Sequence, residues 1–502
     1  MARISVRLAV LALMLALTVP PGRAAELRDV VGATHAAGKY SFSEEDFLNE
    51  GADRLLELGT RVIKIWFQLD AARPYPFHSE WGTPPTDLAG LARKPYYREL
   101  FAKPFTTFIL VVPHAVPFTD GVTPEEAETE RERIYKLARY LLEQYAGSGK
   151  TFIIQNWEGD HLFRQGLDGA EPDPVRIQGM RDWWNARQDG VDQARREVGM
   201  RGVVVAHAAE VNHLADSMDG KVTATNAVVP FTHADLYSYS SWDLRFDRRR
   251  LVDALEYLKA MAPDSELYGE DNIYLGEFGA VRDQVGPGVK LGDLIQGLTD
   301  AAVGWGVRYA VFWQLYCNEA VHPYEGRPRA SDLRGFWLVR PDGVLAASWR
   351  DLKRRMIQSR RMTRLRIATG QLFGTGDGDA AVIADRWRPL PSTRFALIDL
   401  NGEPLRSGDP VAIQARDGFY LDVREEGGVF ASADDTGKTG VFRIWKAGSA
   451  GNNTGTIRRD DDVALQAPSG RYLTAEPGSG RITATGSMIG PAETFRLLLI
   501  PE

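Results

Sequence analysis

The segment Thr151-Phe-Ile-Ile-Gln-Asn-Trp-Glu158 is a short apolar run that ends in a carboxylate. Similar runs recur through residues 26–357, and most are separated by stretches with helical periodicity. The eight runs are Val30–Ala33, Val62–Leu69, Thr107–His114, Thr151–Glu158, Gly202–Ala208, Asp235–Ser240, Ile273–Phe278 and Arg308–Leu315. This alternation predicts an α/β fold, a closed (β/α)₈ TIM barrel. An open doubly wound sheet is disfavoured, because Gly32-Ala-Thr-His35 is not a glycine-rich phosphate turn.

Amphipathic stretches between these runs predict helices. They are Ser43–Leu58, Glu125–Tyr145, Arg181–Val198, Arg248–Met261 and Asp293–Trp305. We interpret Ser43 as the N-cap of the first helix, with Glu44 and Glu45 in its first turn. Trp183 and Trp184 lie in the middle of a helix, where we expect them to pack.

Residues 1–24 are predicted to be a signal peptide. Arg3 and Arg7 form a basic start, Leu8–Val19 is rich in apolar residues, and Gly22-Arg-Ala24 resembles a cleavage site. The apolar run is too short to span a bilayer. We therefore expect export to the periplasm or the extracellular space, without a membrane anchor.

Composition narrows the range of partners. A formal net charge of -7 argues against nucleic acid or anionic lipid and fits a neutral ligand. Cys317 is the single cysteine, which rules out an intramolecular disulfide, and its apolar surroundings favour burial. We expect a monomer that uses no cofactor and no metal.

Residues 363–502 repeat a pattern of short strands and turns. Val411–Leu421 matches Val463–Leu473 at an offset of 52, and Gly370-Gln-Leu-Phe373 is a fainter copy. Each copy is followed by a Phe-x-aliphatic closure, at Phe395, Phe442 and Phe495. Three such lobes predict an all-β domain. They resemble fascin-like β-trefoils rather than ricin-type lectins, whose Gln-x-Trp closure is missing.

Two of the barrel runs have a glutamate at the strand's exit, Glu158 in the fourth and Glu277 in the seventh. Active sites of such barrels lie at the C-terminal ends of the strands. Cleaving a glycosidic bond needs one carboxyl to protonate the leaving oxygen and another to attack or stabilise the anomeric carbon. We therefore interpret Glu158 and Glu277 as a catalytic pair.

These motifs resemble the clan A retaining glycoside hydrolases, the cellulase-like superfamily, over roughly residues 26–357. Gly276-Glu-Phe-Gly279 is close to the nucleophile motif of its family 5 members. The resemblance implies Glu158 as acid/base and Glu277 as nucleophile. It also implies Trp313 as the floor of a sugar subsite, and Tyr237 or Tyr239 as an aromatic residue that contacts the nucleophile.

Two positions depart from that family pattern. The clan has Asn directly before the acid/base, whereas here Trp157 intervenes and Asn156 lies two residues upstream, in phase with Glu158. We expect Asn156 to reach the sugar 2-hydroxyl. Lys64 replaces an arginine of many members, and it cannot offer the bidentate fork of a guanidinium.

Other strand-end residues are predicted to bind substrate. His35, His114 and His207 are expected to bond sugar hydroxyls, and a zinc site built from the three is the alternative. Trp66 and Trp157 are expected to stack on pyranose rings. Glu210 lies at the end of the fifth strand, two residues beyond Ala208, and is the rival candidate for the acid/base.

Two functions follow from these residues. The first is a secreted retaining hydrolase or transglycosylase that acts on a β-linked polysaccharide or oligosaccharide. The second is a non-catalytic glycan-binding protein on a degenerate barrel, with the trefoil as its main binding surface. The intact pair of carboxyls favours the first.

Overall fold

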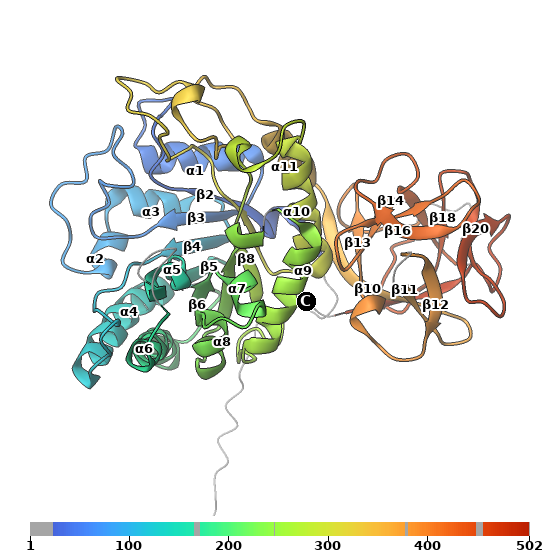
Figure 1. The fold of residues 1–502 in the computed structure, drawn as a ribbon, viewed down its shortest axis with the longest axis horizontal. Coiled ribbons are helices and arrows are strands. Elements are labelled where there is room, and N and C mark those ends of the chain that lie inside the picture. The colour runs from blue at the N-terminus through green and yellow to red at the C-terminus, as the bar shows by residue number, and fades with distance from the viewer. Residues whose placement is uncertain (1–23, 165–170, 245, 377–379, 448–454, 501–502) are drawn as a thin grey trace, which may run out of the picture.

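The computed structural model describes residues 24–164, 171–244, 246–376, 380–447 and 455–500, so the predicted signal peptide lies outside it except for Ala24. Eight parallel strands form a closed barrel (Figure 1). They are β2 (Val31–His35), β3 (Val62–Trp66), β4 (Thr107–Val111), β5 (Thr151–Gln155), β6 (Val204–Val211), β7 (Leu236–Ser240), β8 (Ile273–Phe278) and β9 (Ala310–Phe312). The predicted barrel is confirmed.

Helices surround this barrel, and among the described residues none is both long and apolar enough to cross a membrane. They are α1 (Phe47–Leu58), α2 (Leu88–Ala92), α3 (Pro95–Ala102), α4 (Pro124–Gln144), α5 (Gly159–Arg164), α6 (Pro174–Val198), α7 (Leu214–Met218), α8 (Ala224–Ala227), α9 (Arg248–Met261), α10 (Leu291–Trp305) and α11 (Ala347–Arg355). All five predicted helices exist. Trp183 and Trp184 are buried within α6, as expected.

The predicted N-cap of the first helix is wrong. Helix α1 begins at Phe47, and the side chain of Asp46 accepts a hydrogen bond from the backbone N–H of Asn49 at 3.1 Å. Ser43 lies upstream of the helix, where its hydroxyl donates to Glu50 at 2.9 Å. Aspartate and serine cap helices about equally well, so residue type alone did not distinguish Asp46 from Ser43.

The interior of the barrel is layered, because alternate residues of a strand point inward. Its lower part is mostly apolar, and it includes Val62, Ile109, Ile153, Ala206, Ala208, Leu236, Tyr274 and Val311. The next inward positions along several of these strands are polar or glycine: Lys64, Gln155, Glu210, Ser238 and Gly276. The chemistry of the barrel is therefore concentrated at the C-terminal ends of the strands.

The C-terminal region is an all-β domain, as predicted. Six of its strands pair in a closed cycle: β10 (Ser359–Ile367), β13 (Phe395–Asp399), β14 (Pro410–Ala415), β17 (Phe442–Lys446), β18 (Asp462–Gln466) and β21 (Phe495–Leu499). The other six form three hairpins: β11 (Leu372–Thr375) with β12 (Val382–Arg386), β15 (Tyr420–Val423) with β16 (Val429–Ala433), and β19 (Tyr472–Ala475) with β20 (Ile482–Gly486). A short N-terminal strand, β1 (Ala25–Glu26), pairs with β10.

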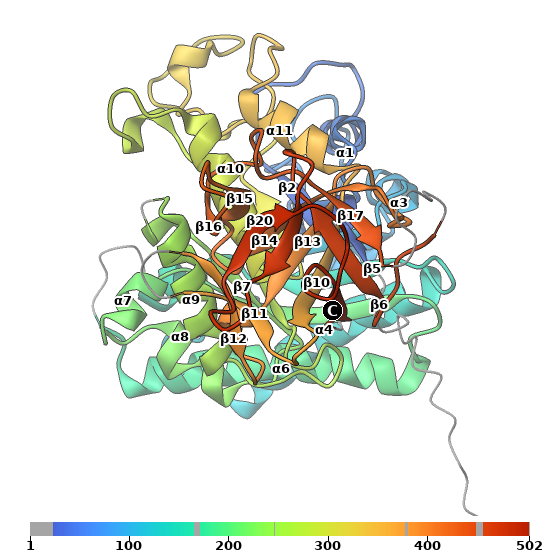
Figure 2. The ribbon, with the colours of Figure 1, turned by 90° about the vertical axis from the view of Figure 1, so that its right-hand side faces the viewer.

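The all-β domain packs against helix α10, which lies between it and the barrel strands; Figure 2 views this domain from the front. The fully buried carboxylate of Asp300 accepts hydrogen bonds from Arg355 at 2.6 Å and from the Tyr420 hydroxyl at 2.8 Å. Gly418 has a φ of +79° and lies so close to α10 that a Cβ there would be 2.4 Å from the Ala301 nitrogen. The two domains therefore share a closely packed interface that is stabilised by buried hydrogen bonds.

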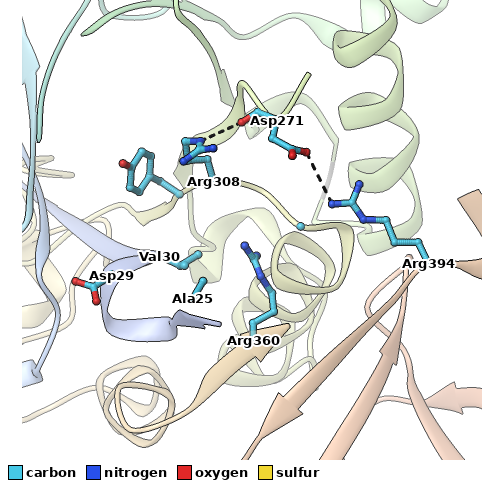
Figure 3. Close-up of a pocket in the computed structure, with 9 residues that line it drawn as sticks. Ala25, Asp29, Val30, Asp271, Arg308, Arg360 and Arg394 are labelled. Atoms are coloured by element: carbon cyan, nitrogen blue, oxygen red, sulfur yellow. Dashed lines mark hydrogen bonds and ion pairs between the residues drawn. The ribbon is translucent and has the colours of Figure 1, made fainter. Parts of the chain in front are cut away.

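A second part of the junction is a small cavity of about 130 Å³, just before the starts of β2, β8 and β9 (Figure 3). Asp271 lies between two arginines there. Its backbone carbonyl accepts from Arg308 at 3.0 Å, and its carboxylate lies 3.9 Å from Arg394 of the all-β domain. Arg360 of β10 donates to the carbonyl of Val307 at 3.1 Å. These contacts join the N-terminal ends of the barrel strands to the all-β domain.

Candidate active site

A buried ion-pair cluster lies at the C-terminal ends of strands β3, β6 and β8. The ammonium of Lys64 is 3.1 Å from Oε2 of Glu210 and 2.9 Å from Oε1 of Glu277. All three side chains are at most 2% exposed. Burial lowers the pKa of Lys64, but Glu210 and Glu277 outweigh that effect and raise it above its ordinary value. Lys64 is therefore a permanent cation beneath the carboxyls.

Glu277 points into the barrel because strand β8 is irregular at this point. Strict alternation after Tyr274 would turn Glu277 outward, but the register with β7 and β9 shifts between Leu275 and Phe278. Gly276 makes this possible, since a Cβ there would lie 1.9 Å from the Ser238 hydroxyl and 2.3 Å from Glu210. The glycine leaves room for the buried carboxylate of Glu210.

Glu158 follows β5 in an unusual backbone conformation, with a φ of +28° that non-glycine residues rarely adopt. Its backbone N–H donates to Oε1 of Glu210 at 3.2 Å. Non-glycine residues with positive φ are frequent at functional sites, where the surrounding structure holds them. The turn directs the Glu158 side chain toward Glu277.

The two predicted catalytic carboxyls meet at one hydroxyl. Oγ of Ser240 is 3.1 Å from Oε1 of Glu158 and 3.1 Å from Oε2 of Glu277. These two oxygens are therefore no more than about 6 Å apart, near the separation of a retaining pair. A hydroxyl has one proton, so both contacts are hydrogen bonds only if one of the carboxyls is protonated.

Electrostatics make Glu158 the carboxyl that holds the proton. Burial, followed by the nearby Glu277 and Glu210, raises the pKa of Glu158 to about 8. Burial also raises the pKa of Glu277, but the ammonium of Lys64 opposes this directly. The arrangement thus favours the proton on Glu158 and the negative charge on Glu277, which is the division of roles that general acid catalysis with a nucleophile requires.

Neither Tyr237 nor Tyr239 contacts Glu277, so that expectation is wrong. Both face away from the barrel interior: the Tyr237 hydroxyl lies 3.1 Å from that of Thr232, and the Tyr239 hydroxyl donates to Asp243 at 2.5 Å. The group that contacts Glu277 from this region is Trp242, whose indole N–H donates to Oε2 at 3.2 Å. Alternation along β7 was the signal that could have excluded both tyrosines.

Asn156 and Glu210 have other partners than the sequence suggested. The amide of Asn156 donates to the Glu210 carbonyl at 2.9 Å and accepts from the Glu210 N–H at 3.0 Å. With both polar atoms engaged, Asn156 joins β5 to β6. The carboxylate of Glu210 lies beneath the pair, where Ser238 donates to it at 2.8 Å and Gln155 at 3.1 Å.

Five of the predicted substrate-binding residues gather near one another. Trp66, His114, Asn156 and Trp157 line a pocket of about 300 Å³ above β3, β4 and β5. Trp313 belongs to the same region, with its ring 5.7 Å from that of Trp66. Trp183 of α6 also borders this pocket, and its side chain is fully buried, in line with the packing role that we expect for it. Sequence reasoning missed Gln68 and Arg73, because they lie in the long loop after β3.

His35 and His207 lie away from this pocket, so the prediction that they bind substrate is wrong. His35 is buried against α1 and bonds the carbonyl of Phe47 at 2.7 Å. His207 is fully buried, and its alternation along β6 turns it from the barrel interior toward α6. A zinc site from His35, His114 and His207 is likewise wrong. Among the described residues, the potential metal ligands that lie together are Asp189, Asp192 and His233, on the surface.

The fold and the site together define a class of protein. It is a closed (β/α)₈ barrel with a buried pair of carboxyls at the C-terminal ends of its strands. No family model and no curated protein matches this chain. Solved structures that it resembles include three glycoside hydrolase family 5 proteins. A GH5_18 protein from Streptomyces cattleya in complex with GlcNAc is 14% identical, with 65% of this chain and 79% of that one covered and a TM-score of 0.43.

The second is a GH5_18 protein from Bifidobacterium longum subsp. longum, 12% identical over 64% of this chain and 78% of that one, with a TM-score of 0.42. The third is a Bacteroidetes-affiliated GH5 cellulase linked with a polysaccharide utilization locus, 15% identical over 66% and 91%, with a TM-score of 0.41. Similarity at this level carries no activity over to this chain.

Proposed function

We propose that the protein is an exported, retaining glycoside hydrolase of clan A type, acting on a β-linked polysaccharide or oligosaccharide. Glu277 is the nucleophile and Glu158 the acid/base of a double displacement. In the first step, Glu277 attacks the anomeric carbon while Glu158 gives its proton to the leaving oxygen. In the second step, Glu158 takes a proton from the water that releases the sugar.

One observation carries this proposal: two carboxyls share the Ser240 hydroxyl at 3.1 Å each, and only one of them is paired with a buried cation. The short separation supports retention over inversion, since an inverting pair needs room for a water molecule. Lys64 and Trp242 both contact Glu277, and they favour its anionic form. Glu158 has no such cation within ion-pair distance among the described residues.

Glu210 is a weaker candidate for the acid. Its side chain is fully buried, and its two oxygens already accept from Lys64, Gln155, Ser238 and the Glu158 N–H. An acid that must reach a glycosidic oxygen needs a path to the cleft. The alternative of a non-catalytic glycan-binding protein is also disfavoured, because a degenerate barrel would be expected to lack one of the two carboxyls, and both are present.

The proposal extends to the rest of the chain. Residues 1–24 are a signal peptide, 26–357 the catalytic domain, and 363–502 a fascin-like β-trefoil that binds the polymer. The closed cycle of six strands with three hairpins supports the trefoil, since each of three lobes supplies two strands of the cycle and one hairpin. Trp66, Trp157, Trp313 and His114 supply the sugar subsites around the pair of carboxyls.

Two alanine variants test the assigned roles. Glu277→Ala should abolish turnover of every substrate, because no covalent intermediate forms. Glu158→Ala should slow natural glycosides by roughly 10²–10⁴-fold, yet spare the first step for an aryl glycoside whose leaving group needs no proton. Azide should then speed the second step and yield a β-glycosyl azide. If Glu210→Ala shows that rescue and Glu158→Ala does not, Glu210 is the acid.

A further inference from the structure

The pocket beside the catalytic carboxyls has an unusual charge for a sugar site. It is about 300 Å³ in volume, and Trp66 and Trp157 are the partly exposed aromatic residues that line it, with the buried Trp183 behind them. Trp157 directly precedes Glu158, and Trp66 lies two residues beyond Lys64 on β3, so the pocket adjoins the reacting centre. Aromatic rings suit the C–H faces of a pyranose. The polar groups around them therefore select which pyranose binds.

Arg73 is the one permanently charged side chain among the described residues that line this pocket, and no carboxylate lines it. The guanidinium of Arg73 takes part in none of the ion pairs or hydrogen bonds found among the described residues. His114 lines the same pocket, and burial lowers its pKa, so it is a neutral hydrogen-bonding group near neutral pH. The amides of Gln68 and Asn156 also line the pocket, so its net positive charge is that of the exposed Arg73 alone, set among neutral polar groups and indole rings.

Neutral sugars are usually held by groups that both donate and accept, because each hydroxyl does both. A guanidinium only donates, in a fork that matches the two oxygens of a carboxylate or a sulfate. We propose that this pocket binds an anionic sugar, one that carries a carboxylate or a sulfate ester, with Arg73 as the residue that selects it. This inference rests on the proposed function, whose cleft it specifies.

It also revises an expectation from composition. The net charge of -7 suggested a neutral ligand, but net charge describes the whole surface and not one pocket. A single arginine beside an aromatic lining is enough to reverse the local preference. Overall repulsion of a polyanion slows its approach, whereas the contact with Arg73 sets its affinity once bound.

Matched substrates test this inference on the full chain. Oligosaccharides of glucuronate, galacturonate and mannuronate are compared with their carboxyl-reduced forms, and sulfated oligosaccharides with their desulfated forms. Binding is measured by calorimetry in a Glu158→Gln background, so that it does not depend on turnover, and kcat/KM is measured in the wild type. We expect at least one anionic form to bind about tenfold or more tightly than its neutral counterpart.

Arg73→Gln should bring that ratio close to one, whereas Arg196→Gln, an exposed arginine at the far end of α6, should keep the wild-type ratio. A preference lost with the carboxylate identifies a uronic acid, and one lost with the sulfate a sulfated sugar. Tighter binding of every neutral form, no binding of any anionic form, or a ratio unchanged by Arg73→Gln overturns the inference. Cleavage of neutral glycans in that case leaves the proposed function standing. Arg73-dependent binding of an anionic sugar without any turnover would support the inference and contradict the proposed function.

Discussion

At the residue scale, the proposed role of Glu158 as the acid depends on its protonation. Its pKa is raised to about 8, chiefly by burial and then by Glu277. Because the acid must be protonated to act, kcat/KM should fall as pH rises through about 8. The measurement is a pH profile on an aryl glycoside with a poor leaving group. Glu158→Ala should lack this alkaline limb, and a profile that keeps it would assign the limb to another group.

The same shift makes stability depend on pH. A carboxyl with a raised pKa binds more protons when folded than when unfolded, so its ionisation costs stability as pH rises from its ordinary range through about 8. Glu158→Gln cannot ionise, and it should exceed the wild type by roughly 2–4 kcal/mol at pH 9 but match it at pH 4. Urea denaturation at the two pH values measures this difference. An equal difference at both would contradict the shifted pKa.

Glu210 acts on Glu158 through its charge. Its carboxylate is one of the causes that raise the pKa of Glu158. Glu210→Gln should therefore move the alkaline limb to lower pH and slow turnover by less than about 100-fold, since Lys64 still pairs with Glu277. Glu130→Gln is the matched control, because Glu130 is equally buried but pairs with Arg133 of α4. A limb that stays in place for Glu210→Gln, or moves as far for Glu130→Gln, contradicts this account.

At the scale of elements, strand β8 depends on one glycine. Gly276→Ala places a methyl group 1.9 Å from Ser238 and 2.3 Å from Glu210, so strand or carboxylate must move. We expect a loss of roughly 2–4 kcal/mol of stability together with most of the activity. Gly286→Ala is the control, since no atom lies within 4 Å of its added Cβ and its φ is ordinary. Equal effects of both would show that the close packing at β8 is not what matters.

Elements were also where sequence patterns predicted best. Short apolar runs located all eight barrel strands, and five helices were found within a few residues, apart from the earlier start of α6 at Pro174. The facing of single side chains was harder. Tyr237 and Tyr239 are the aromatic residues of β7, yet they point away from the cleft, because Leu236, Ser238 and Ser240 occupy its inner face. The family resemblance pointed to these tyrosines by residue type, whereas the alternation of side chains along β7 determines which residues face the cleft.

At the scale of the whole molecule, the all-β domain stabilises the barrel through α10. Asp300 of that helix accepts hydrogen bonds from Tyr420 and Gln414, at 2.8 and 3.2 Å. A chain that ends at residue 357 would expose this face of α10 and leave β1 without its partner β10. We expect its barrel to melt at least about 5 °C below that of the full chain. Calorimetry of both measures this, and identical transitions would show that the domains are energetically separate.

Local sequence patterns were sufficient for the barrel, for the all-β domain and for the two strand-end glutamates, because these follow from short apolar runs, the helical period of 3.6 and a repeat of about 50 residues. The pairing of Lys64 with both Glu210 and Glu277 was not accessible in this way. Nor was the hydroxyl of Ser240, which lies between Glu158 and Glu277. These contacts join residues 37 to 213 positions apart. They depend on how the barrel closes and on the shifted register at β8, and only the tertiary structure decides those.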